Sequence, residues 1–283
     1  MKKLKVRRTL RTMLYHLLVV IFAWIMVYPV IWMLMGAFKT NSEILTSAEV
    51  LLPRQFSFLN FTTGWKGFAG HSFGIFFKNS ILISSIATIG AVVSSAIIAF
   101  GFARCDFRFK KFWFGCMLLS MMLPFQVLMI PQYIMFNKLG WIGTFLPLIV
   151  PQFFGQGFFI FLDVQFIKGL PIELDEAARI DGLSIYGIFL RIILPLIKSA
   201  LVTSAIFSFM WRWDDFLAAL LYLNKPDSYP VSLALKLFSD PATGSDWGAM
   251  FAMASLSLLP IFLIFLTMQK YLVEGIASTG LKN

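Results

Sequence analysis

The sequence predicts an all-α polytopic membrane protein with about six transmembrane helices. The composition, the length of its apolar runs and the placement of its basic residues predict this class. Hydrophobic residues make up 59% of the 283-residue chain and charged residues only 13%, with a mean hydropathy of +0.80. Soluble domains carry about 25% charged residues, and a soluble core of this size cannot hide so much apolar surface. We therefore expect the excess to face lipid.

Apolar runs long enough to cross a bilayer recur along the chain. A hydrocarbon core about 30 Å thick needs about 20 residues of helix. The runs that meet this length predict spans at 13–37, 74–103, 110–136, 143–167, 199–222 and 247–271. The first run follows basic residues, as in a signal peptide, but it is too long and lacks a small-residue cleavage site. We expect it to stay as the first span, so that 13–283 forms one membrane domain after a basic segment, 1–12.

Basic residues cluster at the ends of the apolar runs. They are Lys2, Lys3, Lys5, Arg7, Arg8 and Arg11 before the first run, and Arg104, Arg108, Lys110 and Lys111 between the second and third. Because flanks rich in Lys and Arg stay in the cytoplasm, both termini and the segment 168–198 are predicted to be cytoplasmic. The segments 38–73, 137–142 and 223–246 then face outward. No basic and aromatic face typical of single-strand binding is present, so the net charge of +10 indicates topology and not nucleic acid.

The second predicted span carries small residues at every fourth position, which permit close approach of other helices. They are Ala87, Ala91, Ser95 and Ala99, widened by Gly90, Ser94 and Gly101. Prolines interrupt several spans, and broken helices are tolerated where neighbouring protein or water satisfies the freed backbone groups. The two cysteines, Cys105 and Cys116, are too few for a metal site or a disulfide framework.

The segment between the fourth and fifth spans, 168–198, combines acidic residues with signals that start and end helices. A proline and carboxylates suit the first turn of one helix, and a glycine suits its end. A serine can cap a second helix, which another proline ends. These signals lie at Pro171, Glu173, Asp175, Glu176, Gly182, Ser184 and Pro195. We expect a hairpin of two short helices that exposes its carboxylates and two alanines, either as a docking element or as a solvated loop.

Three motifs resemble those of one family. Glu176-Ala-Ala-Arg-Ile-Asp-Gly182, followed by Leu194-Pro195-Leu196, resembles the EAA loop of ATP-binding-cassette importer permeases. The closest branch in pattern is that of sugar importers, which includes the smaller permease of the maltose transporter. Trp213-Asp-Asp-Phe216 resembles this branch's Trp-Asn-Asp/Glu-Phe element, although Asp214 replaces the usual Asn. The tail from Gln269 through Gly275 to Lys282 is similar to its C-terminal signature, and the resemblance covers essentially the whole chain.

The resemblance implies a permease subunit that forms half of the translocation path of a binding-protein-dependent carbohydrate importer, with oligosaccharides as the expected cargo. It implies that 168–198 is a coupling loop on a cytoplasmic ATPase dimer, and that the docking residues are Glu176, Ala177, Ala178, Asp181 and Gly182. The other implied partners are a sister permease in a heterodimer and an extracytoplasmic sugar-binding protein, for which the loop 223–246 is the expected contact. Membrane lipid surrounds the assembly, in the cell (inner) membrane of a bacterium or archaeon.

The chain lacks the G-x-x-x-x-G-K-[ST] loop that cradles the phosphates of ATP. We therefore expect no enzymatic activity and no cofactor in this chain, with ATP and Mg bound by the partner ATPase. Two alternatives remain open. One is an importer permease of the same kind for a polyamine, phosphate ester or peptide. The other is a stand-alone secondary transporter, which would show internal repeats and would leave the charged hairpin unexplained.

The fifth predicted span contains a charged and aromatic centre, which at such depth usually faces a bundle interior or an aqueous cavity. Arg212 and Asp215 are three positions apart and can pair on one helix face. An aromatic ring beside an acceptor suits a sugar, but the pattern somewhat favours an ion-pair cluster that stabilises a gate near the outer membrane face. The candidate path residues are Trp211, Trp213, Asp214, Asp215, Gln126 and Gln156, with Gln132 and Gln152 as further candidates.

Overall fold

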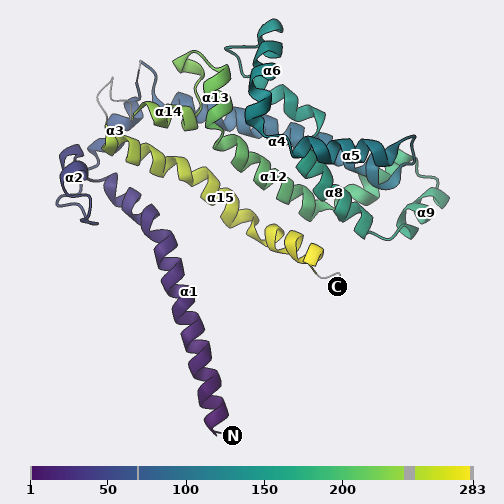
Figure 1. The fold of residues 1–283 in the computed structure, drawn as a ribbon, viewed down its shortest axis with the longest axis horizontal. Coiled ribbons are helices and arrows are strands. Elements are labelled where there is room, and N and C mark those ends of the chain that lie inside the picture. The colour runs from purple at the N-terminus through teal and green to yellow at the C-terminus, as the bar shows by residue number, and fades with distance from the viewer. Residues whose placement is uncertain (1, 69, 239–245, 281–283) are drawn as a thin grey trace. The chain divides into compact units, whose positions relative to one another are not determined.

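The chain forms two compact units, one of residues 1–70 with 235–258 and the other of residues 71–234 with 259–283. The computed structural model describes the backbone of residues 2–68, 70–238 and 246–280, and the side chains of 11–68, 70–238 and 246–271. Every element in this described part is a helix (Figure 1). Most basic side chains of the segment 1–12, and the tail signature from Gly275 onward, lie outside the described side chains.

The first unit contains a long exposed helix, two short helices and the beginning of a second long one. Its helices are α1 (Lys2–Gly36), α2 (Asn41–Thr46), α3 (Leu59–Lys66) and the beginning of α15 (Trp247–Gly280). Apolar side chains of α1 between residues 13 and 28 are exposed, as expected for a surface in contact with lipid. The Asn60 amide donates hydrogen bonds to the carbonyls of Ala37 (2.8 Å) and Lys39 (2.7 Å). The described part of the predicted outward segment, 38–68 with 70–73, is therefore partly helical.

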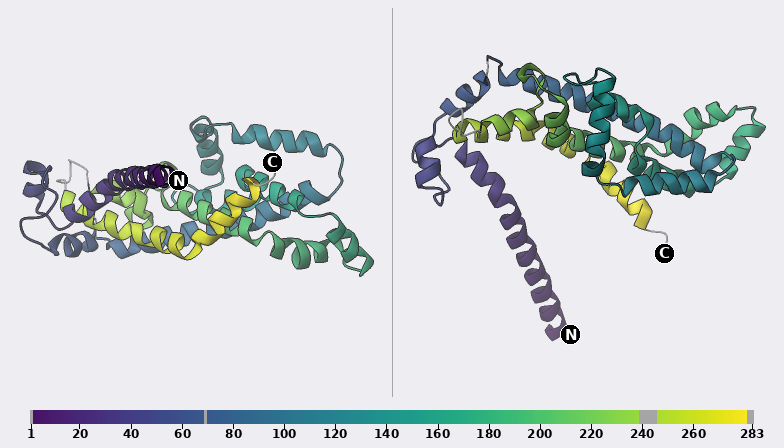
Figure 2. Two further views of the ribbon diagram at one scale, coloured as in Figure 1. Left: turned by 90° about the horizontal axis from the view of Figure 1, so that it is seen from below. Right: turned by 45° about the horizontal axis from the view of Figure 1, so that its top comes forward.

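The second unit is built around α4 (Phe73–Arg104), which packs against α8 (Gly157–Gly169) and α12 (Lys198–Trp213) (Figures 1 and 2). The predicted stripe of small residues lies fully buried in α4: Ala87, Ala91, Ser95 and Ala99. Gly90 belongs to the same face, because a Cβ atom built there would lie 2.5 Å from the ring of Phe153. The prediction that this face permits close helix approach is confirmed, but it is wrong for Gly101, where a Cβ atom would meet nothing within 4 Å.

Three of the predicted spans are broken. The pair α5 (Lys110–Met121) and α6 (Phe125–Lys138) bends by 100°, with Pro124 in the break. The fourth span comprises α7 (Leu146–Ile149), the 3₁₀ helix η1 (Val150–Phe154) and α8, and the fifth continues beyond α12 into α13 (Phe216–Tyr222). Among the described residues, four helices are long and apolar enough to cross a membrane, or up to six if each bent pair is one span. This agrees with the expected class of about six spans.

The predicted hairpin consists of several short helices. They are α9 (Glu173–Ile180), α10 (Ile185–Ile188), the π-helix η2 (Phe189–Ile193) and α11 (Leu194–Leu196). Gly182 ends the first part with a positive φ of 82°, and the Ser184 hydroxyl caps the second by accepting from the Gly187 N–H (3.3 Å). The chain bends by 75° between Leu196 and Lys198, slightly after the proline expected to end the helix. Figure 2 shows the hairpin at one end of α4.

The segment expected as an outward loop, 223–246, is partly packed against α4. It contains η3 (Pro226–Ser228) and α14 (Val231–Leu237), while residues 239–245 lie outside the described part. The Asn79 amide donates to the carbonyls of Asp227 (2.8 Å) and Tyr229 (3.1 Å). The Val231 N–H donates to the Ser80 hydroxyl (2.8 Å), and its side chain is buried. The first half of the segment is therefore ordered on α4, and its outward position stays a prediction.

Candidate functional site

A cavity of about 480 Å³ lies in the second unit, where several helices are broken. Its walls come from the start of α6, from α7 and η1, and from the junction of α12 with α13. The lining residues are Phe125, Gln126, Gln132, Pro147, Leu148, Pro151, Gln152, Gln156, Trp211, Arg212, Asp215, Leu217, Ala218 and Tyr222. Mixed apolar and polar walls of this kind are typical of small-molecule sites.

Amide side chains supply much of the polar lining. All four glutamines named from the sequence reach this one cavity, although they are spread from α6 to the start of α8. The Tyr222 hydroxyl donates to Gln132 Oε1 (3.2 Å), which fixes the orientation of that amide. An amide both donates and accepts hydrogen bonds, so this wall suits a ligand rich in hydroxyl groups.

The backbone break at 152–156 is stabilised by two serines of α4. The Gly155 N–H donates to Ser94 Oγ and the Gln156 N–H donates to Ser95 Oγ, each at 3.0 Å. Gly155 adopts a positive φ of 85°, which interrupts the helix there. Because buried backbone N–H groups need a partner, these hydroxyls replace the missing helix carbonyls. The small-residue pattern predicted close packing here but did not predict these hydrogen bonds. The signal that could have indicated them is the pair Ser94 and Ser95 on one helix together with a helix-breaking Gly155 on another.

The two tryptophans of the charged centre have different surroundings. Trp211 is 46% exposed, lines the cavity and stacks on Phe159 with ring centroids 5.3 Å apart. Trp213 is only 3% exposed, stacks on Phe209 at 5.6 Å and does not line the cavity. Asp214 is exposed and also lies outside the lining. The structure thus brings Trp211 and Asp215 together with the glutamines, and it separates Trp213 and Asp214 from them.

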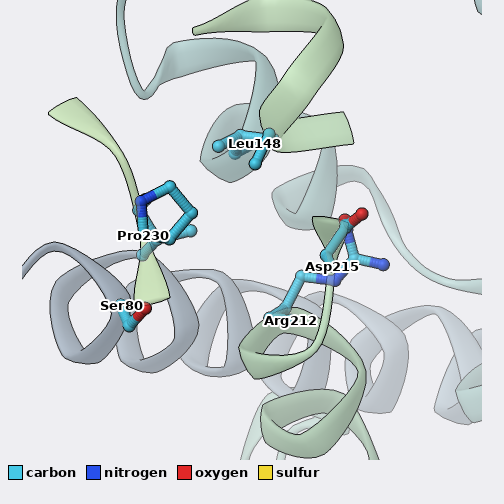
Figure 3. Close-up of a pocket in the computed structure, with 7 residues that line it drawn as sticks. Ser80, Leu148, Arg212, Asp215 and Pro230 are labelled. Atoms are coloured by element: carbon cyan, nitrogen blue, oxygen red, sulfur yellow. The ribbon is translucent and has the colours of Figure 1, made fainter. Parts of the chain in front are cut away.

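Arg212 and Asp215 form the predicted ion pair, with Arg212 Nη1 donating to Asp215 Oδ2 at 3.0 Å. The other carboxylate oxygen of Asp215 accepts from the Ala218 N–H (3.1 Å) and so caps α13. Figure 3 shows the two side chains beside one another, facing Leu148 across a second, very small cavity of about 10 Å³. The pair therefore holds the junction of α12 and α13 and forms a wall of both cavities.

The predicted docking residues do not all lie on the surface. Glu176, Ala177, Asp181 and Gly182 are exposed, but Ala178 is only 3% exposed. It packs in a cluster with Ala99 of α4 and Ile167 of α8. The expectation that the hairpin exposes both alanines is wrong for Ala178, because one face of α9 must seat on the helices beneath it.

Other hairpin residues also differ from the expectation. Asp175, expected among the exposed carboxylates, is buried and pairs with Arg104. The apolar side chains of Ile180 and Tyr186 are highly exposed instead. Hydrophobic side chains exposed beside acidic ones favour a surface that contacts another protein. The sequence predicted a docking surface of carboxylates and alanines here, but not the contribution of Ile180 and Tyr186 to it.

The sequence is similar to those of known transport proteins. Residues 91–278 match the family model described as "Binding-protein-dependent transport system inner membrane component". The chain is 34% identical to the probable ABC transporter permease protein YurM of Bacillus subtilis, over 90% of this chain and 84% of that protein. It is 29% identical to the arabinooligosaccharides transport system permease protein AraQ of Halalkalibacterium halodurans, over 92% and 93%. It is 27% identical to the lactose transport system permease protein LacG of Rhizobium radiobacter, over 96% and 97%.

The fold is also similar to that of a solved structure. A chain in the crystal structure of a bacterial ABC transporter involved in the import of the acidic polysaccharide alginate aligns with a TM-score of 0.80. The alignment covers 92% of this chain and 95% of that chain, at 20% sequence identity. At that identity the likeness concerns the fold alone.

Proposed function

The chain belongs to the family of binding-protein-dependent transport system inner membrane components, and from that premise we propose that it is the permease half of an oligosaccharide importer. It lines part of the path, and a partner ATPase supplies the energy. The observation that carries this proposal is the cavity of about 480 Å³ with glutamine amides and an accessible tryptophan on its wall. Relatives named for arabinooligosaccharide and lactose transport support the choice of cargo.

The cavity wall suits a neutral saccharide for two physical reasons. Gln126 and Gln156 can hydrogen-bond to sugar hydroxyls in either sense, since an amide is both donor and acceptor. Trp211 offers an apolar ring against the C–H face of a sugar. The charges of Arg212 and Asp215 neutralise one another, so no unpaired charge of the wall repels or traps an uncharged solute.

Coupling to ATP is assigned to the exposed part of the hairpin. Glu176, Ala177, Asp181 and Gly182 lie on its surface, with the exposed side chains of Ile180 and Tyr186 nearby. Such a compact mixed surface fits a groove in a cytoplasmic ATPase dimer, which binds the ATP and Mg that this chain does not. Ala178 contributes indirectly, because it packs under α9 against α4 and α8, and a larger side chain there would displace α9.

The assembly implied by this role has four kinds of component. This chain pairs with a sister permease to close the path, two ATP-binding subunits lie on the cytoplasmic side, and a sugar-binding protein delivers cargo from outside. Both termini and the hairpin lie in the cytoplasm of a bacterial or archaeal cell, in keeping with the basic N-terminus and the six expected crossings.

The test is to purify the chain from native membranes with its bound proteins and to reconstitute the complex in proteoliposomes. We expect ATP hydrolysis to rise with a loaded binding protein, and labelled neutral oligosaccharides to accumulate. A polyamine, phosphate ester or peptide that accumulates in their place would refute the cargo assignment. Accumulation by this chain alone, driven by an ion gradient without ATP, would refute the importer and support a secondary transporter.

Cavity variants make the cargo assignment specific. Gln156→Ala is expected to change the relative uptake of different oligosaccharides by about fivefold, because one hydrogen bond to the sugar is lost. Gln165→Ala is the matched control, since Gln165 lies exposed on α8 and away from the cavity. Equal selectivity in the two variants would argue against the cavity as the sugar path.

A further inference from the structure

A buried ion pair joins the hairpin to the end of α4. Arg104, the last residue of α4, places Nε 2.9 Å from Asp175 Oδ2 of α9, and the two side chains are 6% and 1% exposed. Arg104 Nη2 also donates to the carbonyl of Leu170, just before α9, at 2.9 Å. The Arg104 guanidinium therefore contacts the hairpin at two points, the Leu170 carbonyl in the segment before α9 and the Asp175 carboxylate on α9.

Among the residues that the structure describes, Asp175 is the carboxylate that pairs with this arginine. Asp106 is fully exposed and lies 3.7 Å from Lys110 instead. Ala178, three positions after Asp175, faces the same side of α9 and packs in the cluster that contains Ala99 and Phe100 of α4. The buried face of α9 is thus seated on α4 by one ion pair and one small apolar residue, while Glu176 and Ala177 remain exposed.

Stability alone is a poor reason for such a pair. Taking two charges out of water costs nearly as much as their attraction returns, and apolar replacements of both partners are often neutral or stabilising. What this planar guanidinium adds is direction, since its Nη2–H group donates to the Leu170 carbonyl along a fixed vector while its charge attracts the Asp175 carboxylate. A directional link is useful where one element must transmit the displacement of another.

From these contacts we infer that Arg104 and Asp175 are positioning residues that make α9 and α4 move as one body. Displacement of α9 then carries α4 with it. Nine residues along α4, about 14 Å, Ser95 holds the N–H of Gln156 at the cavity wall. The link thus runs from the docking surface to the substrate cavity, through α4 alone. The inference rests on the proposed function, because it needs a partner that displaces α9.

The first measurement is the number of oligosaccharide molecules taken up per ATP hydrolysed by the reconstituted complex. Asp175→Asn keeps the shape of the side chain but removes its charge. We expect the ratio to fall by about tenfold, within the usual range of coupling between sites, at an equal amount of assembled complex. Asp106→Asn is the matched control, since it breaks an exposed ion pair next to the same helix end and should leave the ratio unchanged.

A second variant separates positioning from stability. Arg104→Met combined with Asp175→Leu removes both charges and should assemble as well as the original chain. We expect it to keep the low ratio, because an apolar contact has no fixed direction. Recovery of the original ratio in this double variant would show that the pair only stabilises the fold, and it would overturn the inference. This test remains decisive even if Asp175→Asn alone assembles poorly.

Spin labels test the rigid link directly. With Cys105 and Cys116 replaced by serine, labels at Glu173 of α9 and Ile97 of α4, both exposed, should show the same distance without nucleotide and with trapped ATP. In Asp175→Asn the distance is expected to differ between the two states. Identical distances in that variant would overturn the inference. A complex that shows the rigid link but transports no oligosaccharide would refute the proposed cargo and leave the link established.

Discussion

Asp215 uses both carboxylate oxygens to hold a helix junction, one toward Arg212 Nη1 at 3.0 Å and one toward the Ala218 N–H at 3.1 Å. The same two side chains line the large cavity. The pair that the sequence assigned either to structure or to the path thus holds the helix junction and also lies on the wall of the proposed path. Each carboxylate oxygen accepts one hydrogen bond from the protein, and the N–H groups of Arg212 and the nearby amides also line the cavity.

This geometry predicts different effects for two substitutions of Asp215. Asp215→Asn retains an oxygen that can cap α13, whereas Asp215→Ala loses both the cap and the ion pair. Loss of an N-cap costs about 1 kcal/mol, so we expect Asp215→Ala to be less stable than Asp215→Asn by about that amount. The midpoint of thermal unfolding in detergent measures the difference. Equal midpoints would contradict the capping role.

The two tryptophans should respond oppositely to truncation. Trp213→Ala removes a buried ring and should lower the stability by about 3–5 kcal/mol. Trp211→Ala should leave the unfolding midpoint nearly unchanged but alter the relative uptake of oligosaccharides, because its half-exposed ring faces the cavity. Thermal unfolding and uptake assays on the same preparations check both. A selectivity change in Trp213→Ala without loss of stability would reverse the assignment.

Close packing of α4 predicts a contrast between two of its glycines. A Cβ at Gly90 would lie 2.5 Å from the Phe153 ring, whereas one at Gly101 would meet nothing within 4 Å. We expect Gly90→Ala to destabilise the protein by about 1–3 kcal/mol through overpacking. Gly101→Ala should be neutral or slightly stabilising, since alanine favours helix. Unfolding midpoints that do not separate the two variants would contradict the packing.

The docking surface predicts uncoupling on substitution of Glu176 or Gly182. Glu176→Ala removes an exposed carboxylate, and Gly182→Val forces a β-branched residue into a positive φ of 82°. Both should leave membrane insertion intact and lower oligosaccharide uptake while ATP hydrolysis continues. Gly182→Asn is the control, because asparagine tolerates this conformation, and should retain uptake. Unimpaired uptake in both Glu176→Ala and Gly182→Val would contradict the proposal that these residues dock on the ATPase.

Local patterns predicted some features of the site correctly and failed on others for a common reason. The pairing of Arg212 with Asp215 was predictable, because residues three apart on a helix face one another. The burial of Ala178 was not predictable, because the sequence of a short helix does not show which of its faces packs against other helices. The hydrogen bond from the Gln156 N–H to Ser95 joins residues 61 positions apart, and no local signal marks it.

The sequence by itself determined the membrane class, the approximate number of spans, the hairpin and the family motifs, because hydropathy, helix signals and motif spacing are properties of neighbouring residues. Only the tertiary structure decided which polar groups share the cavity, that Trp211 and not Trp213 faces it, and that Arg104 pairs with Asp175. Those contacts depend on how broken helices cross. The bend angles arise from packing between segments distant in the chain, so they cannot be read from any one of them.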